Sequence, residues 1–338
     1  PILRALALNI YMEQSAVRDG VTAEEVKGIL LGMASGQETL LGYFRRFIRN
    51  FEKRVGINRT VGSLRAYSNA YSHIERFLQA QYKLSDIPFS ALDRSFIDKY
   101  DLYLRTERNL APGTIINLTV QLKTIVGEAI ADGIITASPF MGYEPMRPKH
   151  VQKYLTAEEL HRIMTTPLHR QTLYHVRDMF LFSCFTGIPY GDMRLLTKDN
   201  LCLAEDGIWW IKSARQKTKI EFEIPLLDLP LQILKKYSGT APGDKLLPMY
   251  CNSTLNLYLK EIARICHIDR PLVFHAGRHT YATEITLSHG VPLETVSRML
   301  GHSQIETTQI YAKVTDEKID ADTKALNRKI SERFSVVI

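Results

Sequence analysis

Residues 141–154, MGYEPMRPKHVQKY, interrupt a chain whose apolar residues otherwise recur mostly at helical spacing. The stretch contains prolines and a glycine and shows no hydrophobic periodicity, which is typical of a connection between folded units. A helical pattern resumes at Thr156, with Glu159 three residues later, the spacing of a capping box. We therefore expect a linker over residues 143–154, within the range of about two or three domains that this chain length allows.

The unit before the linker, residues 36–142, is expected to be a helical domain. Its first segment repeats apolar side chains at three- and four-residue spacing, the pattern of an amphipathic helix. These side chains are Tyr43, Phe44, Phe47, Ile48 and Phe51. Further helices are predicted over residues 63–82, 89–104 and 114–132.

Residues 1–35 precede this domain and are also expected to be helical, with a turn at Asp19-Gly20. Thr22 and Glu25 stand at the spacing of a second capping box. This spacing predicts that a helix begins directly after Thr22.

Basic residues accompany both the first helix and the linker, and the net charge is +7. Binding to DNA depends on many contacts between basic side chains and phosphates, so these positions are candidate DNA contacts. A solvated surface on an ordinary basic enzyme fits the same charge. The candidates are Arg45, Arg46, Arg49, Lys53, Arg147, Lys149 and Lys153.

Several classes of protein are not supported by the composition. No apolar run approaches the roughly 18 residues of a membrane span, and no signal peptide is recognisable. The cysteines are scattered without a CxxC pair, so neither a zinc site nor a disulfide framework is indicated. We expect a cytoplasmic protein without a metal, a cofactor or a membrane partner.

The unit after the linker, residues 155–338, is expected to be mostly helical with one β element. Residues 207–226 predict two strands around a polar turn, because apolar side chains alternate with glutamates in the second of them. Lys217 falls at or beside that turn. The tail, residues 319–338, is amphipathic and could pack on its own domain or on a neighbouring protomer.

Two short motifs carry most of the chemistry-bearing residues. In FHAGRHTYAT, residues 274–283, His275 and Arg278 are three residues apart and would share one face of a helix. In LGHSQIETTQIYA, His302 follows a glycine that would end the preceding helix. Tyr311 lies nine residues further on, in a helix that Ser303 and Glu306 would cap.

In this order and at these spacings, the motifs resemble the tyrosine recombinase (phage integrase) family. The first matches the family's H-x-x-R-H box, and the second matches its L-G-H…Y box. The hairpin lysine agrees as well, and the resemblance extends over residues 37–311. The family's upstream box, T-G-[LMI]-R-x-[SG]-[ED], matches TGIPYGD, residues 186–192, at every position but one.

The resemblance implies a mainly α fold, in which a helical core-binding domain precedes a mostly helical catalytic domain with a small antiparallel sheet. It implies an integrase that cuts and rejoins double-stranded DNA at recombination sites through a 3′-phosphotyrosine, without metal or ATP. The protein would be a monomer when free and a homo-tetramer on paired sites, with accessory DNA-bending or directionality proteins as further partners. Residues 1–35 would be the remnant of an arm-binding domain.

The resemblance also assigns roles to residues. Tyr311 would be the nucleophile, and a phenol with an ordinary pKa of about 10 needs a base or a cationic setting for that role. Arg278 would bind two phosphate oxygens as a fork, and Lys217 would protonate the leaving 5′ oxygen. His275 and His302 would donate hydrogen bonds or move protons. Asp192 and His279 would support the site.

Pro189 stands where the family has its first catalytic arginine. A proline cannot bind a phosphate oxygen and has no N–H group. Arg215 is one candidate replacement, since strand alternation would place it on the same face as Lys217. Arg177, at the start of an apolar helix, is the other, whereas Arg194 would face outward from its helix.

Two other functions are compatible with this pattern. A DNA-binding protein with an impaired recombinase site would explain Pro189. A topoisomerase IB-like enzyme would use the same chemistry to relax supercoils. Adduct formation with a nicked DNA site separates the first of these from an active recombinase, and relaxation without site preference would identify the second.

Overall fold

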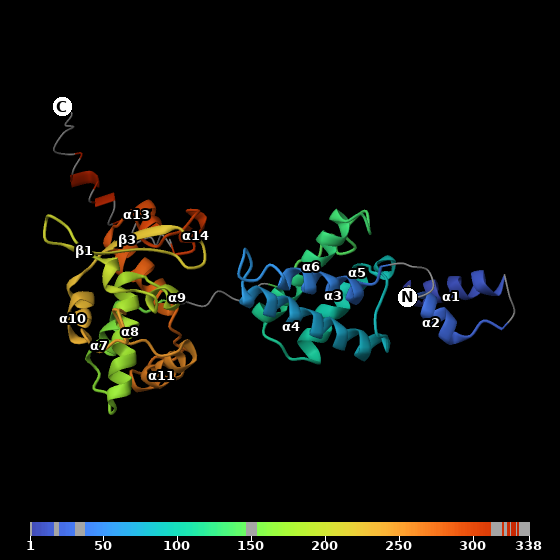
Figure 1. Cartoon of the computed structure of the whole chain (residues 1–338), viewed down its shortest axis with the longest axis horizontal. Helices are drawn as coiled ribbons and strands as arrows, with labels where there is room; N and C mark the ends of the chain where they lie inside the picture. Colours follow the sequence, from blue (N-terminus) through green and yellow to red (C-terminus); the bar gives the residue numbers. More distant parts are fainter. Residues whose placement is uncertain are drawn as a thin grey trace. The chain divides into compact units, whose positions relative to one another are not determined.

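The structure is a computed structural model of the chain, and it describes residues 2–16, 20–30, 38–146, 154–311, 320, 323–324, 326–328 and 330. The chain divides into two compact units, Pro1–His150 and Val151–Ile338 (Figure 1). This division falls within the expected linker. Three of the candidate DNA contacts, Arg147, Lys149 and Lys153, lie outside the described residues, as does most of the tail.

The first unit is helical throughout its described part. Its α-helices are α1 (Ile2–Ser15), α2 (Ala23–Leu30), α3 (Leu40–Glu52), α4 (Val61–Phe77), α5 (Arg94–Thr106) and α6 (Pro112–Ala131). A π-helical turn, η1 (Leu78–Tyr82), extends α4, and a short 3₁₀ turn, η2 (Phe89–Ala91), precedes α5.

Local signals in the sequence explain where these helices begin. The capping box at Thr22 is present, with the backbone N–H of Glu25 donating to the Thr22 hydroxyl at 3.2 Å. Asp93 caps α5 by accepting from the N–H of Phe96 at 2.7 Å, and Pro112 occupies the first turn of α6, where a missing N–H costs nothing.

Helices α3 to α6 enclose an aromatic core, as their apolar spacing predicted. Phe44, Phe77, Phe96 and Tyr100 are almost completely buried. The rings of Phe77 and Phe96 meet edge to face, with centroids 5.3 Å apart. Such pairs contribute about 0.5–1.5 kcal/mol beyond the burial of their area.

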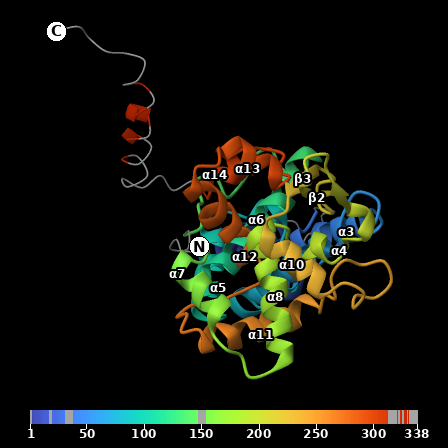
Figure 2. The ribbon, with the colours of Figure 1, turned by 90° about the vertical axis from the view of Figure 1, so that its left-hand side faces the viewer.

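The second unit combines helices with a small sheet. Its helices are α7 (Ala157–Thr165), α8 (Gln171–Thr186), α9 (Tyr190–Met193), α10 (Asp228–Lys236), α11 (Asn252–Ile265), α12 (Ala276–Thr280), α13 (Leu293–Met299) and α14 (Glu306–Gln309). Short turns η3 (Lys198–Asn200), η4 (Tyr281–Thr286) and η5 (Leu287–His289) complete it. Helix α8, the expected buried helix, packs against α7, α10, α11 and α12, so it forms the centre of this unit (Figure 2).

The sheet has three antiparallel strands in the order β1 (Leu201–Leu203), β2 (Trp209–Ala214) and β3 (Glu221–Pro225). Strands β2 and β3 form the predicted hairpin, with Ile211 opposite Ile224. The sequence pattern did not reveal β1, which is only three residues long. The mainly α fold class with a small antiparallel sheet is confirmed.

Two local expectations were wrong. Arg215 and Lys217 do not alternate along a strand, because β2 ends at Ala214 and both residues belong to the turn. Tyr311 does not lie inside a capped helix, because α14 begins at Glu306 after an uncapped Ile305 and ends two residues before the tyrosine. Both errors arise from treating tight turns as continuations of regular elements.

The expected end of the helix before His302 is correct. Helix α13 stops at Met299, and Gly301 follows with φ +62°, a left-handed conformation that favours glycine. No helix within the described ranges is long and apolar enough to cross a membrane.

Candidate active site

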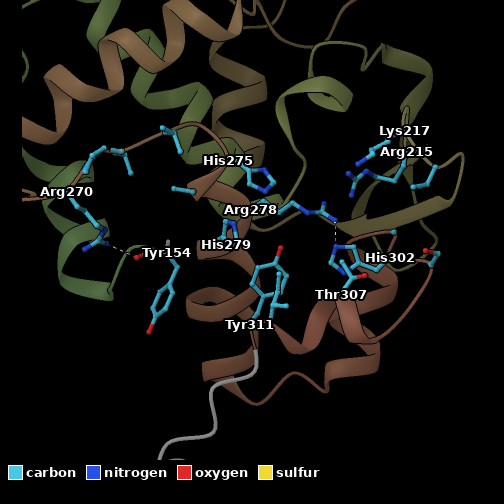
Figure 3. Close-up of a pocket in the computed structure, with 18 residues that line it drawn as sticks. Tyr154, Arg215, Lys217, Arg270, His275, Arg278, His279, His302, Thr307 and Tyr311 are labelled. Carbon is cyan, nitrogen blue, oxygen red and sulfur yellow. Dashed lines mark hydrogen bonds between the residues drawn. The ribbon is translucent and has the colours of Figure 1, made fainter. Parts of the chain in front are cut away.

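A pocket of about 820 Å³ lies within the second unit. Four segments far apart in the sequence line it: the β2–β3 turn, the residues before and within α12, the corner between α13 and α14, and Tyr154. Figure 3 shows the side chains of Arg278, His302 and Tyr311 turned toward one another, with His275 beside them. Among them are all the residues assigned to catalysis from the motifs: Lys217, His275, Arg278, His302 and Tyr311.

Arg278 is the most deeply buried cation of this group, with 3% of the residue exposed. Its Nη1 donates to the carbonyl oxygen of Gly187 at 2.9 Å, and its Nη2 donates to that of Leu300 at 2.6 Å. Burial, followed by repulsion from Arg215, lowers the pKa of Arg278 to about 10. The guanidinium therefore remains charged at neutral pH and is held rigidly by backbone carbonyls.

Arg215 lies beside Arg278 and shares one of its partners. Its Nη1 donates to the carbonyl oxygen of Leu300 at 3.0 Å, so two guanidinium groups converge on a single peptide group. Its Nε is 2.6 Å from Oδ2 of Asp192, in an ion pair that is not aligned as a hydrogen bond. Asp192 in turn accepts from the N–H of Gln216 at 2.8 Å, which fixes the hairpin turn.

His302 bridges Arg278 and α14. Its Nε2 lies 2.8 Å from Nη2 of Arg278, and its Nδ1 lies 2.7 Å from Oγ1 of Thr308. Burial, together with the charges of Arg278 and Arg215, lowers the pKa of His302 to about 4. His302 is therefore neutral at physiological pH in the absence of DNA.

Tyr311 faces the same cations, with only 7% of the residue exposed. Its ring is parallel to that of His302, with centroids 6.2 Å apart, and meets His279 edge to face at 5.0 Å. Burial raises the pKa of the Tyr311 phenol, while Arg278 and Arg215 act in the opposite direction. The phenol is protonated before substrate arrives.

The remaining candidates line the rim of the pocket. Lys217 is exposed on the hairpin turn, from which its long side chain can move. His275 is exposed, while His279 is half-buried, and their rings meet edge to face at 4.9 Å. The structure thus brings together every residue of the two motifs that the resemblance singled out.

Arg177 was a wrong candidate for a place in this pocket. Its guanidinium donates to the carbonyl oxygen of Met164 at 3.2 Å and lies 4.8 Å from the centre of the Tyr174 ring. It is absent from the pocket lining, as is the exposed Arg194. The expectation failed because Arg177 is half-buried on α8 and occupied outside the pocket, by Tyr174 one turn earlier, by the adjacent Asp178 and by the Met164 carbonyl.

Two pocket features were not found from the sequence. Arg270 lies in the wall, where its guanidinium contacts both carboxylate oxygens of Glu159 and the carbonyl oxygen of Tyr154. Glu159 was recognised only as a helix cap, a role it also fills. Thr308 is completely buried behind His302, and a threonine pair within a short helix gives no sequence signal for that contact.

The candidate DNA contacts of the first unit lie on or just after α3 and are exposed. Arg45 donates to the Tyr71 hydroxyl, and Arg46 pairs with Glu38 at 2.6 Å. Arg49 and Lys53 lie on the same segment. In the described part of the chain, no group of His, Cys, Asp or Glu side chains is arranged to hold a metal ion.

Comparison with known families gives two matches along the chain. Residues 39–145 match the Phage integrase SAM-like domain, and residues 153–318 match the Phage integrase family. The tyrosine recombinase XerD of Listeria monocytogenes is 25% identical over 273 residues, which cover 76% of this chain and 89% of that protein.

Solved structures show the same fold. The Tn1549 transposon integrase in complex with a circular intermediate DNA superposes with a TM-score of 0.67 at 18% identity, covering 85% of this chain and 99% of that one. A lambda integrase tetramer bound to a Holliday junction gives a TM-score of 0.66 at 17% identity, covering 83% and 80%.

Proposed function

Because the chain belongs to the phage integrase family of tyrosine recombinases, we propose that it cuts and rejoins duplex DNA at specific sites through a 3′-phosphotyrosine intermediate. The observation that carries this proposal is the convergence of Tyr311, Arg278 and His302 in one pocket. A binding protein without chemistry has no need of a buried phenol beside buried guanidinium groups.

The reaction follows from the chemistry of these groups. The phenol oxygen of Tyr311 loses its proton and forms a bond to the scissile phosphorus, while the bond from phosphorus to the 5′ oxygen breaks. Lys217, exposed on its turn, supplies a proton to the leaving 5′ oxygen. One phosphodiester replaces another, so strand joining reverses the step without ATP.

The transition state carries extra negative charge on the phosphate oxygens, and fixed cations stabilise it most effectively in a site that excludes water. Arg278 is such a cation. We propose that Arg215 supplies the second guanidinium. It would replace the family's first catalytic arginine, at whose position this chain has Pro189. Its shared hydrogen-bond partner with Arg278, the Leu300 carbonyl, supports this assignment.

Tyr311 must lose its phenolic proton to form this bond. In the DNA-free protein, burial raises the phenol's pKa. Loss of the phenolic proton therefore requires a base in the pocket. His275 and His279, on the same side of the pocket, are placed to accept it.

The partners follow from the family. The Tn1549 and lambda integrases were solved with DNA, the latter as a tetramer on a Holliday junction. We propose that four copies of this chain assemble on paired duplex sites and that the free protein is a monomer. We place it in the bacterial cytoplasm, with the exposed basic face of α3 contacting phosphates.

A nicked suicide substrate tests the proposal, because loss of the short cleaved fragment traps the covalent complex on a denaturing gel. The wild-type protein is expected to form an adduct, and Tyr311→Phe is expected to form none. Tyr250→Phe is a matched control, since this exposed tyrosine lies in the same unit but outside the pocket. An adduct that persists in Tyr311→Phe would exclude Tyr311 as the nucleophile.

Pro189 favours one second candidate, a DNA-binding protein with an impaired site. It begins α9 in an extended conformation and offers no cation to the pocket. Site-specific binding by the wild-type protein with no adduct, on substrates of several candidate sequences, would support this alternative.

A further inference from the structure

The corner between α13 and α14 holds His302 in one protonation pattern. Its Nε2 lies 2.8 Å from Nη2 of Arg278, and a guanidinium has donors only. Nε2 must therefore accept this hydrogen bond and carry no proton. A neutral imidazole then bears its proton on Nδ1, which donates to the Thr308 hydroxyl oxygen at 2.7 Å.

We propose that Thr308 is a positioning residue that fixes His302 as the Nδ1–H tautomer and turns Nε2 toward the scissile phosphate. This inference rests on the proposed recombinase function only for its consequence in catalysis. Thr308 is completely buried, and its own N–H donates to the carbonyl oxygen of Ile305 at 2.8 Å. The hydroxyl is thus held in place by the fold rather than by the histidine.

The surroundings of His302 explain why a hydroxyl performs this task. Arg278 from α12, Arg215 from the hairpin and Tyr311 from the chain after α14 all face it. The other ionisable groups that line the pocket are Tyr154, Lys217, Arg270, His275 and His279, and no carboxylate is among the described lining residues. Asp192, an acidic group outside the lining, is paired with Arg215.

A carboxylate on Nδ1 would stabilise the imidazolium, as it does in many catalytic histidines. A hydroxyl orients the ring without adding charge, so His302 stays neutral, which agrees with its lowered pKa. When a phosphate binds to Arg278, its negative charge favours uptake of a proton from solvent at Nε2. The imidazolium then donates from Nε2 to a phosphate oxygen, while Nδ1–H remains on Thr308 and the ring does not turn.

Nitrogen NMR of the DNA-free protein with ¹⁵N-labelled histidine tests the tautomer directly. The wild type is expected to show a protonated Nδ1 and an unprotonated Nε2 for His302 at neutral pH, with His302→Gln identifying its signals among the ten histidines. Thr308→Ser keeps the hydroxyl and should keep this pattern. Thr308→Val removes it and should move the ring toward the Nε2–H form or a mixture.

Cleavage of the suicide substrate supplies the second readout. Removing a group that orients a functional histidine typically costs about 10–100-fold, so Thr308→Val should cleave that much more slowly and with an altered pH profile. Thr308→Ser should cleave close to the wild-type rate. Thermal unfolding of both variants shows whether any loss reflects the fold instead.

Two outcomes overturn the proposal. One is an Nε2–H signal for His302 in the wild type, which does not depend on either Thr308 variant. The other is a folded Thr308→Val with the wild-type tautomer and pH profile. If the wild type forms no adduct, the proposed function fails, while the NMR result still decides the tautomer.

Discussion

The arginines assigned to DNA contact in the first unit and those lining the pocket in the second lie in opposite environments. In the first unit, Arg45, Arg46 and Arg49 are exposed on α3 above a core of aromatic rings. In the second unit, 3% of Arg278 and 16% of the Arg215 side chain are exposed, and both groups donate to a backbone carbonyl.

The two environments suit two different roles: exposed arginines suit DNA binding, and buried arginines suit catalysis. An exposed cation attracts phosphates through water, and salt screens that attraction within about 8–10 Å. Burying a cation costs desolvation energy, which the fold must offset. In return, a buried cation stabilises the negative charge of a neighbouring transition state with little screening by water. We therefore expect changes in the first unit to alter affinity and changes in the second to alter rate.

The largest expected effect is at Arg278. Replacement by Lys leaves one ammonium group where a guanidinium contacts Gly187, Leu300 and His302. An arginine directed at a transferring phosphoryl group contributes about 10³–10⁵-fold in rate, so single-turnover adduct formation should fall by that order. DNA affinity, measured by gel shift, should change far less. Equal losses in affinity and rate would contradict the assignment of binding to the first unit and chemistry to the second.

Arg215 and Arg177 form a matched pair for the next test. Arg215→Ala removes a pocket cation and should slow adduct formation by about 10²–10³-fold. Arg177→Ala removes an arginine of the same unit that lies outside the pocket, so cleavage by the folded protein should persist. A normal rate in Arg215→Ala would show that Pro189 has another replacement or needs none.

The first unit is tested by the salt dependence of binding. Arg49→Ala should weaken binding to all DNA sequences similarly and reduce the slope of log K against log salt by about 1. Adduct formation at saturating DNA should be unchanged. A loss of rate at saturation would mean that this exposed face contributes to chemistry.

The smallest effect concerns pH and the stability of the second unit. The pKa of His302 is lowered to about 4 in the fold, so the unfolded chain binds its proton more readily, near pH 6.5. Stability from this group is therefore complete above about pH 6.5 and is lost as the pH falls toward 4. Relative to His302→Gln, the wild-type Tm should fall more steeply across that window in thermal melts.

Much of this arrangement was predictable from the residues. Helical spacing of aromatic side chains identified the core around Phe44, and the two motifs identified Tyr311, Arg278, His275 and His302 together. The domain limits and the catalytic roles remain predictions.

The rest depends on contacts between distant segments. Strand alternation gave the wrong reason for pairing Arg215 with Lys217, because β2 ends at Ala214 and both residues lie in the connection to β3. Met164, whose carbonyl oxygen accepts from Arg177, lies on another helix, and Thr308 reaches His302 because the chain turns over residues 303–305. The spacing of residues along the sequence does not predict contacts that depend on such turns.

Gly301 carries no functional group, yet any other residue there would strain the site. Its φ of +62° disfavours other residues, and an added Cβ would lie 2.9 Å from Cγ of Arg215 and 3.3 Å from Cβ of Phe222. A random screen for inactive recombinases should thus recover substitutions at Gly301 as readily as substitutions at the reactive residues. A list of active-site residues drawn from such a screen would include a glycine whose contribution is the absence of a Cβ atom.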